Sequence, residues 1–397
     1  MQIWVIRGKV TPELLSGASL DTIDLNRDWS SRMFDIDAQA AGLPRFDDVA
    51  RAYDAILVLS FGGPEGVDDV IPFLENVTRG RGVPPERLAE VAEHYYHFGG
   101  VSPINAQNRA LIAALETDLK DHGIDLPIYF GNRNWHPLLA DTLRQMKDDG
   151  VQRALAFVTS AFSSYSSCRQ YREDLAAATA EVGDGAPAID KIRVFYNHPG
   201  FLEPVAKHLR AAIEQFPAER RDQVRVLFTA HSIPMSMATT SAYEAQLRDA
   251  MAIVSDLAGV RHSTLCYQSR SGSPSVPWLE PDFADVMTDL HADGHTDVIV
   301  CPIGFVSDHL EVLFDLDEEG AEHAAELGMT YVRAATVGTH PRFVAMIREL
   351  IEERMTASPV RCALGANGPV HDNCPVNCCK PAPRPQMRTG MAATAAP

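Results

Sequence analysis

Apolar runs alternate with helical stretches twice along this chain of 397 residues, and that alternation constrains the fold most strongly. In the first round, Ala55–Phe61 and Ala154–Phe162 are apolar runs typical of strands buried on both faces. The helical stretch Asn108–Gly123 lies between them and ends in a glycine suited to a left-handed cap. The second round begins with the apolar run Val224–Ala230 and ends with the helical stretch Pro341–Met355. Two such rounds predict an α/β protein with two doubly wound domains.

The same patterns divide the chain into four parts. They predict further strands at Pro127–Gly131, Ser263–Ser269 and Asp297–Phe305, and further helices at Leu139–Gly150, Ala242–Gly259 and Asp282–Gly294. We expect a first Rossmann-like domain at residues 51–165 plus 335–357, and a second at 166–334. Residues 1–50 have weak periodicity and are expected to be a disordered N-terminal extension. Residues 358–397 are rich in Pro, Gly, Ala and Cys, and we expect a Cys-rich tail with a disordered end.

Charge and hydropathy exclude several classes of protein. The chain has 35 Lys and Arg against 53 Asp and Glu, a net charge of −18, so a nucleic-acid-binding surface is not expected. No apolar run approaches the 18 or so residues of a membrane-spanning helix. The first residues contain Arg7 and Lys9 and lead to no small-residue cleavage site, so we expect no secretory signal and a cytoplasmic location.

Polar and titratable side chains follow the carboxyl ends of four predicted strands, where open α/β sheets bind their ligands. His231 directly follows one strand, and Asp308, His309 and Glu311 follow another. Imidazole with carboxylate suits a first-row divalent cation, or a base that accepts a proton. For His231 alone, the simpler interpretation is a strand-end histidine that satisfies a neighbouring carbonyl.

Three carboxylates follow at a regular interval. Glu311, Asp315 and Glu319 have the spacing i, i+4, i+8, which on an α-helix makes one acidic line about 12 Å long. A solvated helix face is the ordinary explanation, but the segment is otherwise apolar. Like charges at this spacing repel unless a cation or proton intervenes. The line therefore indicates a route for cations or protons.

The ordered motifs LSFGGPEG, HFGGVSPI, TAHSIP, YQSRSGSPSVPWLEPD and PIGFVSDHLEVLFDLD resemble those of the ferrochelatases. More narrowly, they are similar to the actinobacterial coproporphyrin III ferrochelatases. The resemblance covers about Tyr53 to Met355. It implies two Rossmann-like domains that face each other across a porphyrin cleft. It also implies insertion of Fe2+ into coproporphyrin III, with loss of two pyrrole protons, in haem biosynthesis.

The resemblance implies roles for individual residues by position. His231 matches the family's histidine, as metal ligand and proton acceptor, and Glu311 matches its partner carboxylate and metal ligand. Asp315 and Glu319 match an acidic relay. The substrate-binding residues that it implies are Phe61, Arg79, Tyr95, Ser102 and Tyr171. Arg79 would lie beside the propionates. Phe61 stands where other ferrochelatases have Tyr or Met, and since a phenyl ring cannot ligate a metal it would form a wall against the macrocycle.

Seven cysteines include four near the C-terminus, which favours a metal site over disulfides in a reducing compartment. The resemblance implies a [2Fe–2S] cluster as cofactor, held by Cys168, Cys362, Cys374 and Cys379, with Cys378 as the alternative to Cys379. A zinc site is the rival, because four thiolates also suit zinc. Cys266 and Cys301 lie in apolar strands and are expected to be small buried hydrophobic residues.

Two other functions fit parts of the pattern. Protoporphyrin IX, with two carboxylates, could replace coproporphyrin, with four; the many charges in Val70–Phe98 favour the more soluble substrate. A non-catalytic haem or iron carrier with an iron–sulfur sensor is the second alternative. A nucleotide-binding protein is disfavoured because G-x-G-x-x-G and phosphate-loop patterns are absent. We expect a monomer that binds coproporphyrin III and Fe2+ and contacts other haem-pathway enzymes only transiently.

Overall fold

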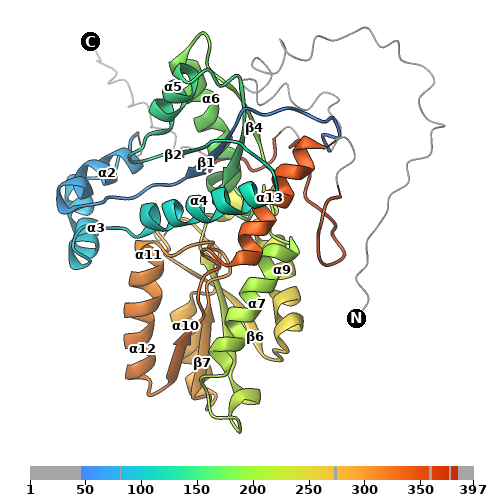
Figure 1. Ribbon diagram of the computed structural model, residues 1–397. Helices are drawn as coiled ribbons and strands as arrows, with labels where there is room; N and C mark the ends of the chain where they lie inside the picture. The colour runs from blue at the N-terminus through green and yellow to red at the C-terminus, as the bar shows by residue number, and fades with distance from the viewer. Residues whose placement is uncertain (1–45, 81, 272–274, 357–359, 375–376, 383–397) are drawn as a thin grey trace, which may run out of the picture.

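Two parallel four-stranded sheets form the framework of the protein. The computed structural model describes residues 46–80, 82–271, 275–356, 360–374 and 377–382. The strand order is β2-β1-β3-β4 in the first sheet and β6-β5-β7-β8 in the second. All pairings within both sheets are parallel. The first sheet occupies the upper half of Figure 1 and the second the lower half, which confirms the predicted pair of Rossmann-like halves.

The first sheet follows the apolar runs closely. Its strands are β1 (Ala55–Ser60), β2 (Ile128–Asn132), β3 (Arg153–Val158) and β4 (Ala188–Lys191). Strand β1 is buried along its whole length, as expected for a central parallel strand covered on both faces. Strand β4 was not predicted, because its four residues AIDK carry no apolar run. It pairs with β3, so the first sheet includes residues beyond the predicted domain boundary between residues 165 and 166.

The second sheet repeats this arrangement. Its strands are β5 (Arg225–His231), β6 (Ser263–Gln268), β7 (Asp297–Cys301) and β8 (Thr330–Arg333). Strand β7 ends four residues earlier than predicted, where Pro302 removes a backbone N–H from the ladder. The loop after β7 therefore begins at Pro302 and not after Phe305.

Helices surround both sheets. The α-helices of the first half and the connection are α2 (Val70–Val77), α3 (Pro85–His97), α4 (Ile104–Asp121), α5 (Leu139–Asp148), α6 (Gln170–Val182) and α7 (Pro199–Ile213). Those that follow are α8 (Met235–Ala238), α9 (Tyr243–Ala258), α10 (Phe283–Ala292), α11 (Leu310–Val312), α12 (Gly320–Glu326) and α13 (Pro341–Met355). Short 3-10 turns are η3 (Val67–Asp69) and η5 (Arg221–Gln223), and π-helical segments are η4 (Tyr165–Arg169) and η6 (Leu313–Glu319). In the described part of the chain, no helix is both long and apolar enough to cross a membrane.

Helix α13 joins the two halves. It packs against α4 and α7, and it lies between the two sheets in Figure 1. Its Phe343 ring contacts the rings of Phe157, Phe195 and Phe201 in one apolar core, with ring centroids 6.2 to 6.4 Å apart. Because this core continues from the first sheet into the second half, the loops at the strand ends are held in a fixed relation.

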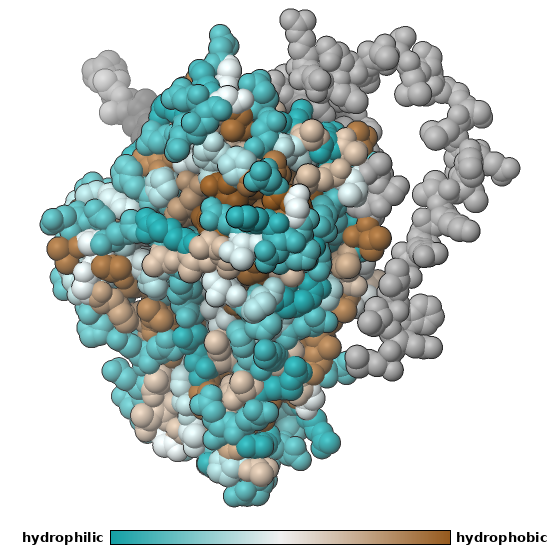
Figure 2. Space-filling view, in the orientation of Figure 1, coloured by the Kyte–Doolittle hydropathy of each residue, from teal (hydrophilic) through white to brown (hydrophobic). Residues whose placement is uncertain are grey.

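One group of exposed apolar side chains lies at an edge of the molecule. Figure 2 shows a mostly hydrophilic face with brown patches over the region of α2 and α3. The large exposed apolar residues of this region are Phe61, Val67, Tyr96 and Val101. Phe61 follows β1 directly, so this apolar edge begins at the carboxyl end of the first sheet.

Candidate active site

His231 lies at the carboxyl end of β5, with one ring nitrogen fixed and the other available. Nδ1 is hydrogen-bonded to the backbone carbonyl of Ser232. Because a carbonyl oxygen can only accept, Nδ1 carries the proton and Nε2 of the neutral ring keeps its lone pair. Nε2 lies 3.9 Å from Oε2 of Glu311. The simpler interpretation, a histidine that satisfies a carbonyl, thus describes Nδ1 only, and Nε2 is directed at a carboxylate.

Glu311 brings a second imidazole into the group. Its Oε2 also lies 3.9 Å from Nδ1 of His309, which precedes α11. Burial lowers the pKa of His309, the charge of Glu311 raises it and His231 lowers it further; the net shift is downward. His309 is therefore held neutral and can also offer a lone pair. The sequence placed His309 beside Glu311, but its role becomes visible only from this geometry.

The neighbouring Asp308 is already engaged. Its carboxylate accepts hydrogen bonds from Arg333 at 3.1 Å and from the Thr336 hydroxyl at 3.1 Å. Its backbone N–H donates to the side-chain oxygen of Gln107 in α4, 2.9 Å away. Asp308 therefore anchors the loop that carries His309 and Glu311, rather than adding a free carboxylate to the site.

The acidic line does not lie on an α-helix as expected. Helix α11 is only three residues long and continues as the π-helical segment η6, which holds Asp315 and Glu319. Because a π-helix turns more widely than an α-helix, the estimate of 12 Å from the α-helical rise does not apply. Segments of this kind occur frequently at functional sites.

Asp315 is the carboxyl of this line that titrates near neutral pH. Burial raises its pKa to about 6, with a further increase from Glu311. Hydrogen bonds donated by Ser269 and by Gln268, the latter 3.2 Å long, oppose that increase. Burial also raises the pKa of Glu319, whose side chain is exposed. The line thus runs from exposed Glu311 through partly buried Asp315 to exposed Glu319.

Phe61 forms one wall of an aromatic group. Its ring lies 6.3 Å from Phe73, and the guanidinium of Arg133 lies 5.7 Å from the Phe61 ring centroid. The same guanidinium lies 4.7 Å from the Tyr171 ring and is paired with Asp174. Tyr171 is only 5% exposed, so it supports Arg133 from beneath rather than presenting its own ring to a ligand.

Tyr95 connects this aromatic wall with Glu311. Its ring packs 5.8 Å from Phe73, and burial together with the charge of Glu311 raises the pKa of its hydroxyl. Helix α3, which carries Tyr95, also reaches the second half directly. The His94 ring stacks on Phe314 of η6 with centroids 4.0 Å apart. Side chains of the two halves therefore meet at this point.

The structure places the other two predicted substrate-binding residues differently. Ser102 is 5% exposed and lies against Gly63, where a Cβ would come within 2.7 Å of the Ser102 Cβ. Gly63 is therefore required for this close approach. Arg79 is exposed just after the end of α2, and no described carboxylate lies within 4.0 Å of it. It is not part of the His231–Glu311 group.

Four thiols line a separate cavity of about 420 Å³. They belong to Cys168, Cys374, Cys378 and Cys379. The Cys168 thiol adjoins that of Cys374, the Cys374 thiol adjoins that of Cys378, and the Cys378 thiol adjoins that of Cys379. Basic side chains that share the lining are Arg172, Lys191, Arg193 and Arg354. This donor set suits an iron–sulfur cluster or a zinc ion, and the positive charges can balance thiolates.

The structure does not bring Cys362, also a predicted ligand, together with these four thiols. It does not line the cavity, and its sulfur lies beside His198 and Glu349. The spacing of cysteines along the chain could not separate the two places, because Cys362 and Cys374 are joined by an irregular stretch with positive φ at Gly365 and Gly368. Cys266 and Cys301 are buried in β6 and β7, as expected.

Comparisons with known proteins identify the family of the chain. The profile of the family described as Ferrochelatase matches residues 53–355. A ferrochelatase of Rhodopirellula baltica is 56% identical over 333 residues, covering 84% of this chain and 95% of that protein. A coproporphyrin III ferrochelatase of Streptomyces coelicolor is 52% identical over 361 residues, covering 85% and 96%. One from Nocardia farcinica is 52% identical over 347 residues, covering 84% and 98%. With this coverage, and with His231 and Glu311 directed at each other, the chain belongs to the ferrochelatase family.

Proposed function

We propose that this protein inserts Fe2+ into coproporphyrin III and so forms coprohaem in haem biosynthesis. Relatives about 50% identical over nearly their full length are named coproporphyrin III ferrochelatases. The observation that carries the proposal is the pair formed by His231 Nε2 and Glu311 Oε2, 3.9 Å apart.

Insertion of Fe2+ into a porphyrin requires groups that replace the water bound to Fe2+ and groups that accept two pyrrole protons. Neutral His231 and the Glu311 carboxylate can exchange for waters one at a time, so the ion is never bare. Nε2 of His231 is also a base that can accept a pyrrole proton, because the Ser232 carbonyl holds the ring in the required tautomer. Asp315, whose pKa is raised to about 6, can take protons from the site and pass them toward Glu319.

The porphyrin fits the aromatic side of this group. Phe61 is 37% exposed and is supported by Arg133 and Phe73, so its ring can cover the face of a flat macrocycle. Arg79 has no described carboxylate partner and can bind a propionate in a forked hydrogen bond. A porphyrin with four carboxylates gains more from such a group than a porphyrin with two.

Protoporphyrin IX remains the alternative substrate, and the exposed apolar edge at Val67, Tyr96 and Val101 favours it. The test is anaerobic incubation of the full chain with Fe2+ and each porphyrin separately, followed by absorption spectroscopy. We expect a kcat/KM at least tenfold higher for coproporphyrin III. Equal or higher values for protoporphyrin IX would contradict the assigned substrate.

Arg79→Ala gives a finer test of substrate choice. We expect a severalfold increase in KM for coproporphyrin III, because one of its four carboxylates loses its partner. We expect little change for protoporphyrin IX, which has only two carboxylates to bind. Arg87→Ala is the matched control, since Arg87 is exposed but paired with Glu90 at 2.7 Å. If both variants changed KM equally, the effect would be one of general charge and the propionate contact would be refuted.

We also propose that Cys168, Cys374, Cys378 and Cys379 hold a [2Fe–2S] cluster. Four thiols around one cavity with adjoining basic side chains support this assignment. The cluster would join residues 374–379 to the segment that carries Cys168 and so have a structural or sensing role. The purified chain should be reddish brown, and Cys362→Ser should keep the colour while Cys374→Ser loses it. A colourless protein that contains zinc would favour the zinc alternative.

We further propose that the protein acts as a monomer in the cytoplasm, with only transient contacts to other haem-pathway enzymes. The supporting observations are the mostly hydrophilic face in Figure 2 and the net charge of −18. Size-exclusion chromatography with light scattering should give one chain per particle at micromolar concentration.

A further inference from the structure

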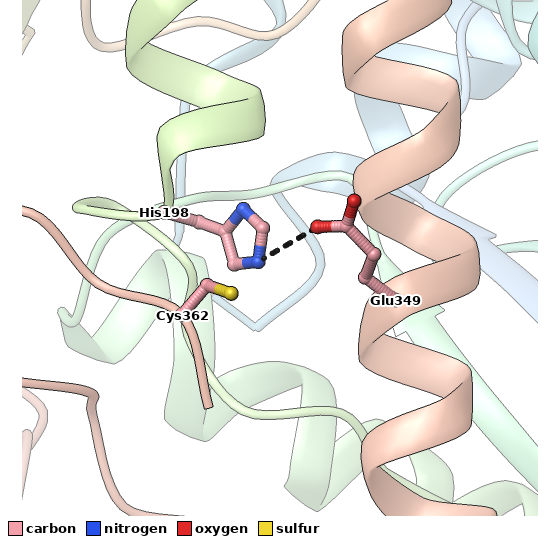
Figure 3. Close-up of side chains that lie close together, drawn as sticks. All are labelled: His198, Glu349 and Cys362. Carbon is pink, nitrogen blue, oxygen red and sulfur yellow. Dashed lines mark ion pairs between the residues drawn. The ribbon is translucent and has the colours of Figure 1, made fainter. Parts of the chain in front are cut away.

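A second group of metal-ligating side chains lies outside both sites described above. Cys362, His198 and Glu349 each offer one ligand atom, and these atoms all lie within 4.8 Å of one another. His198 precedes α7, Glu349 belongs to α13, and Cys362 lies in the stretch after α13. Figure 3 shows the His198 ring between the Cys362 thiol and the Glu349 carboxylate. The start of α7, helix α13 and the stretch after it therefore bring together a thiol, an imidazole and a carboxylate.

Two buried polar atoms in this group have no hydrogen-bond partner among the described residues. They are Nε2 of His198, whose side chain is 0% exposed, and Oε2 of Glu349. The two atoms lie 3.5 Å apart, beyond a good hydrogen bond. Buried polar atoms nearly always have a hydrogen-bond partner, so we expect a further group that bonds to both atoms. A cation between them would bond to both.

We propose that His198, Glu349 and Cys362 form a binding site for a divalent cation of the zinc type, distinct from the metal-insertion site. Imidazole nitrogen, carboxylate oxygen and thiolate are all zinc ligands, with bonds of about 2.0–2.3 Å. A tetrahedral ion with such bonds sets its ligand atoms about 3.5 Å apart. The His198–Glu349 distance already has this value, and rotation of the Cys362 side chain can supply the rest.

Protonation has to change when the cation binds. The backbone N–H of Gly200 donates to His198 Nδ1 at 3.0 Å, which places the proton of the neutral ring on Nε2. On binding, the Nε2 proton leaves, Nδ1 takes a proton from solvent, and the Cys362 thiol releases one to solvent. The site thereby gives up one cap hydrogen bond and gains three metal bonds. The thiolate and the carboxylate then both face the ion, and the other oxygen of Glu349 keeps its ion pair with Arg342 at 2.8 Å.

Binding would fasten the C-terminal stretch to the body of the protein. Cys362 and Glu349 are partly exposed, so water can reach the ion and fill a fourth position. The ion would tie the residue at 362 to the start of α7 and to α13. We therefore expect an exchangeable cation that stabilises the docking of residues 360–374.

The test is equilibrium dialysis of the full chain, with its native cofactor in place, against Zn2+, followed by metal analysis. Besides any zinc held by the His231–Glu311 pair, the wild type should bind one zinc that is lost, or weakened at least tenfold, in Cys362→Ser, Glu349→Gln and His198→Asn. Asn can still cap α7, so this last variant removes the imidazole with little harm to the helix. Cys301→Ala, in strand β7, is the matched control and should bind zinc as the wild type does.

X-ray absorption at the zinc edge provides a readout that does not depend on the variants. Zinc at the proposed site has one sulfur neighbour with nitrogen and oxygen, whereas zinc among the four cavity thiols has four sulfurs. Added Zn2+ should also raise the Tm of the wild type by more than that of Cys362→Ser. No bound zinc, a four-sulfur environment, or unchanged binding by Cys362→Ser would each overturn the proposal.

Discussion

At the scale of single residues, the account depends on which nitrogen of His231 is free. The Ser232 carbonyl fixes the proton on Nδ1 and so leaves the lone pair on Nε2, 3.9 Å from Glu311. A group at that position can ligate Fe2+ or take a pyrrole proton only in this tautomer. The charge of Glu311 acts in turn on the pKa values of the nearby His309 and Tyr95, and the neighbours of that carboxylate thus come from both halves.

His231→Ala tests this role most simply. We expect loss of metal insertion by at least a factor of one thousand, because both the ligand and the base disappear, while porphyrin binding stays near the wild-type value. Fluorescence quenching measures porphyrin binding and absorption measures insertion. Normal turnover by the variant would refute the role, and His262→Ala, at a surface position just before β6, serves as the control.

At the scale of secondary-structure elements, the π-helical segment η6 sets the behaviour of the acidic line. It holds Asp315 next to the Gln268 and Ser269 donors while burial raises its pKa. The same segment supplies Phe314 to the stack with His94 of α3. A change in η6 should therefore affect proton transfer and the contact between the halves together.

Asp315→Asn should change stability in a pH-dependent way. The pKa of Asp315 is about 6 in the folded protein, above its value of about 3.9 in an unfolded chain. The folded state therefore binds the proton more tightly, and the stability that this proton contributes is lost as pH rises through 6. Relative to wild type, the variant should be more stable at pH 8, and this gain should vanish near pH 4.

Urea unfolding at the two pH values measures this difference. The control is Asp256→Asn, which removes an exposed carboxylate from α9 and should cause no pH-dependent change. A gain at pH 4 that equals the gain at pH 8 would show that Asp315 titrates as an ordinary surface carboxylate.

The elements differ in how far the sequence predicts them. Central strands such as β1 and β5 follow from long apolar runs, because a strand buried on both faces needs apolar side chains at every position. The edge strands β4 and β8 were missed since each has four residues of mixed polarity. The sequence predicted an α-helix where η6 lies, because an interval of four residues between carboxylates does not distinguish an α-helix from a π-helix.

At the scale of the whole molecule, ion pairs attach both ends of the described chain to α13. Arg354 of α13 is paired with Asp47 at 3.0 Å and with Asp372 at 3.4 Å, and these three side chains are at most 6% exposed. Arg361 pairs with Asp372 at 3.0 Å. Buried charges of this kind are costly to leave without a partner. The predicted extension at residues 1–50 is therefore too long, because Asp47 belongs to the fold.

Two truncations distinguish these boundaries. Removal of residues 1–50 should lower the free energy of unfolding by about 2 kcal/mol more than removal of residues 1–45 does. The reason is the loss of the Asp47 contacts with Arg354 and with the Asp372 carboxylate. Asp47→Asn in the full chain should reproduce part of the loss. Equal stability of the two truncated chains would show that Asp47 contributes nothing.

The site was predicted unevenly at this scale as well. His231 and Glu311 follow strands whose carboxyl ends had to lie at the same edge of one sheet, so their meeting was predictable. The place of Cys362 depends on how the chain folds back after α13, and no periodicity encodes that path. The environment of Glu311 was not predictable, because it depends on contacts between α3 and η6, which lie more than 200 residues apart in the sequence.

The measurement that tests the central claim most directly is the number of turnovers under anaerobic conditions. The full chain is incubated with Fe2+ and a large molar excess of coproporphyrin III, and coprohaem is quantified by absorption. We predict that each chain forms many equivalents of coprohaem and that His231→Ala forms essentially none. Product that stops near one equivalent per chain would show a haem or iron carrier instead of a catalyst, and would contradict the account.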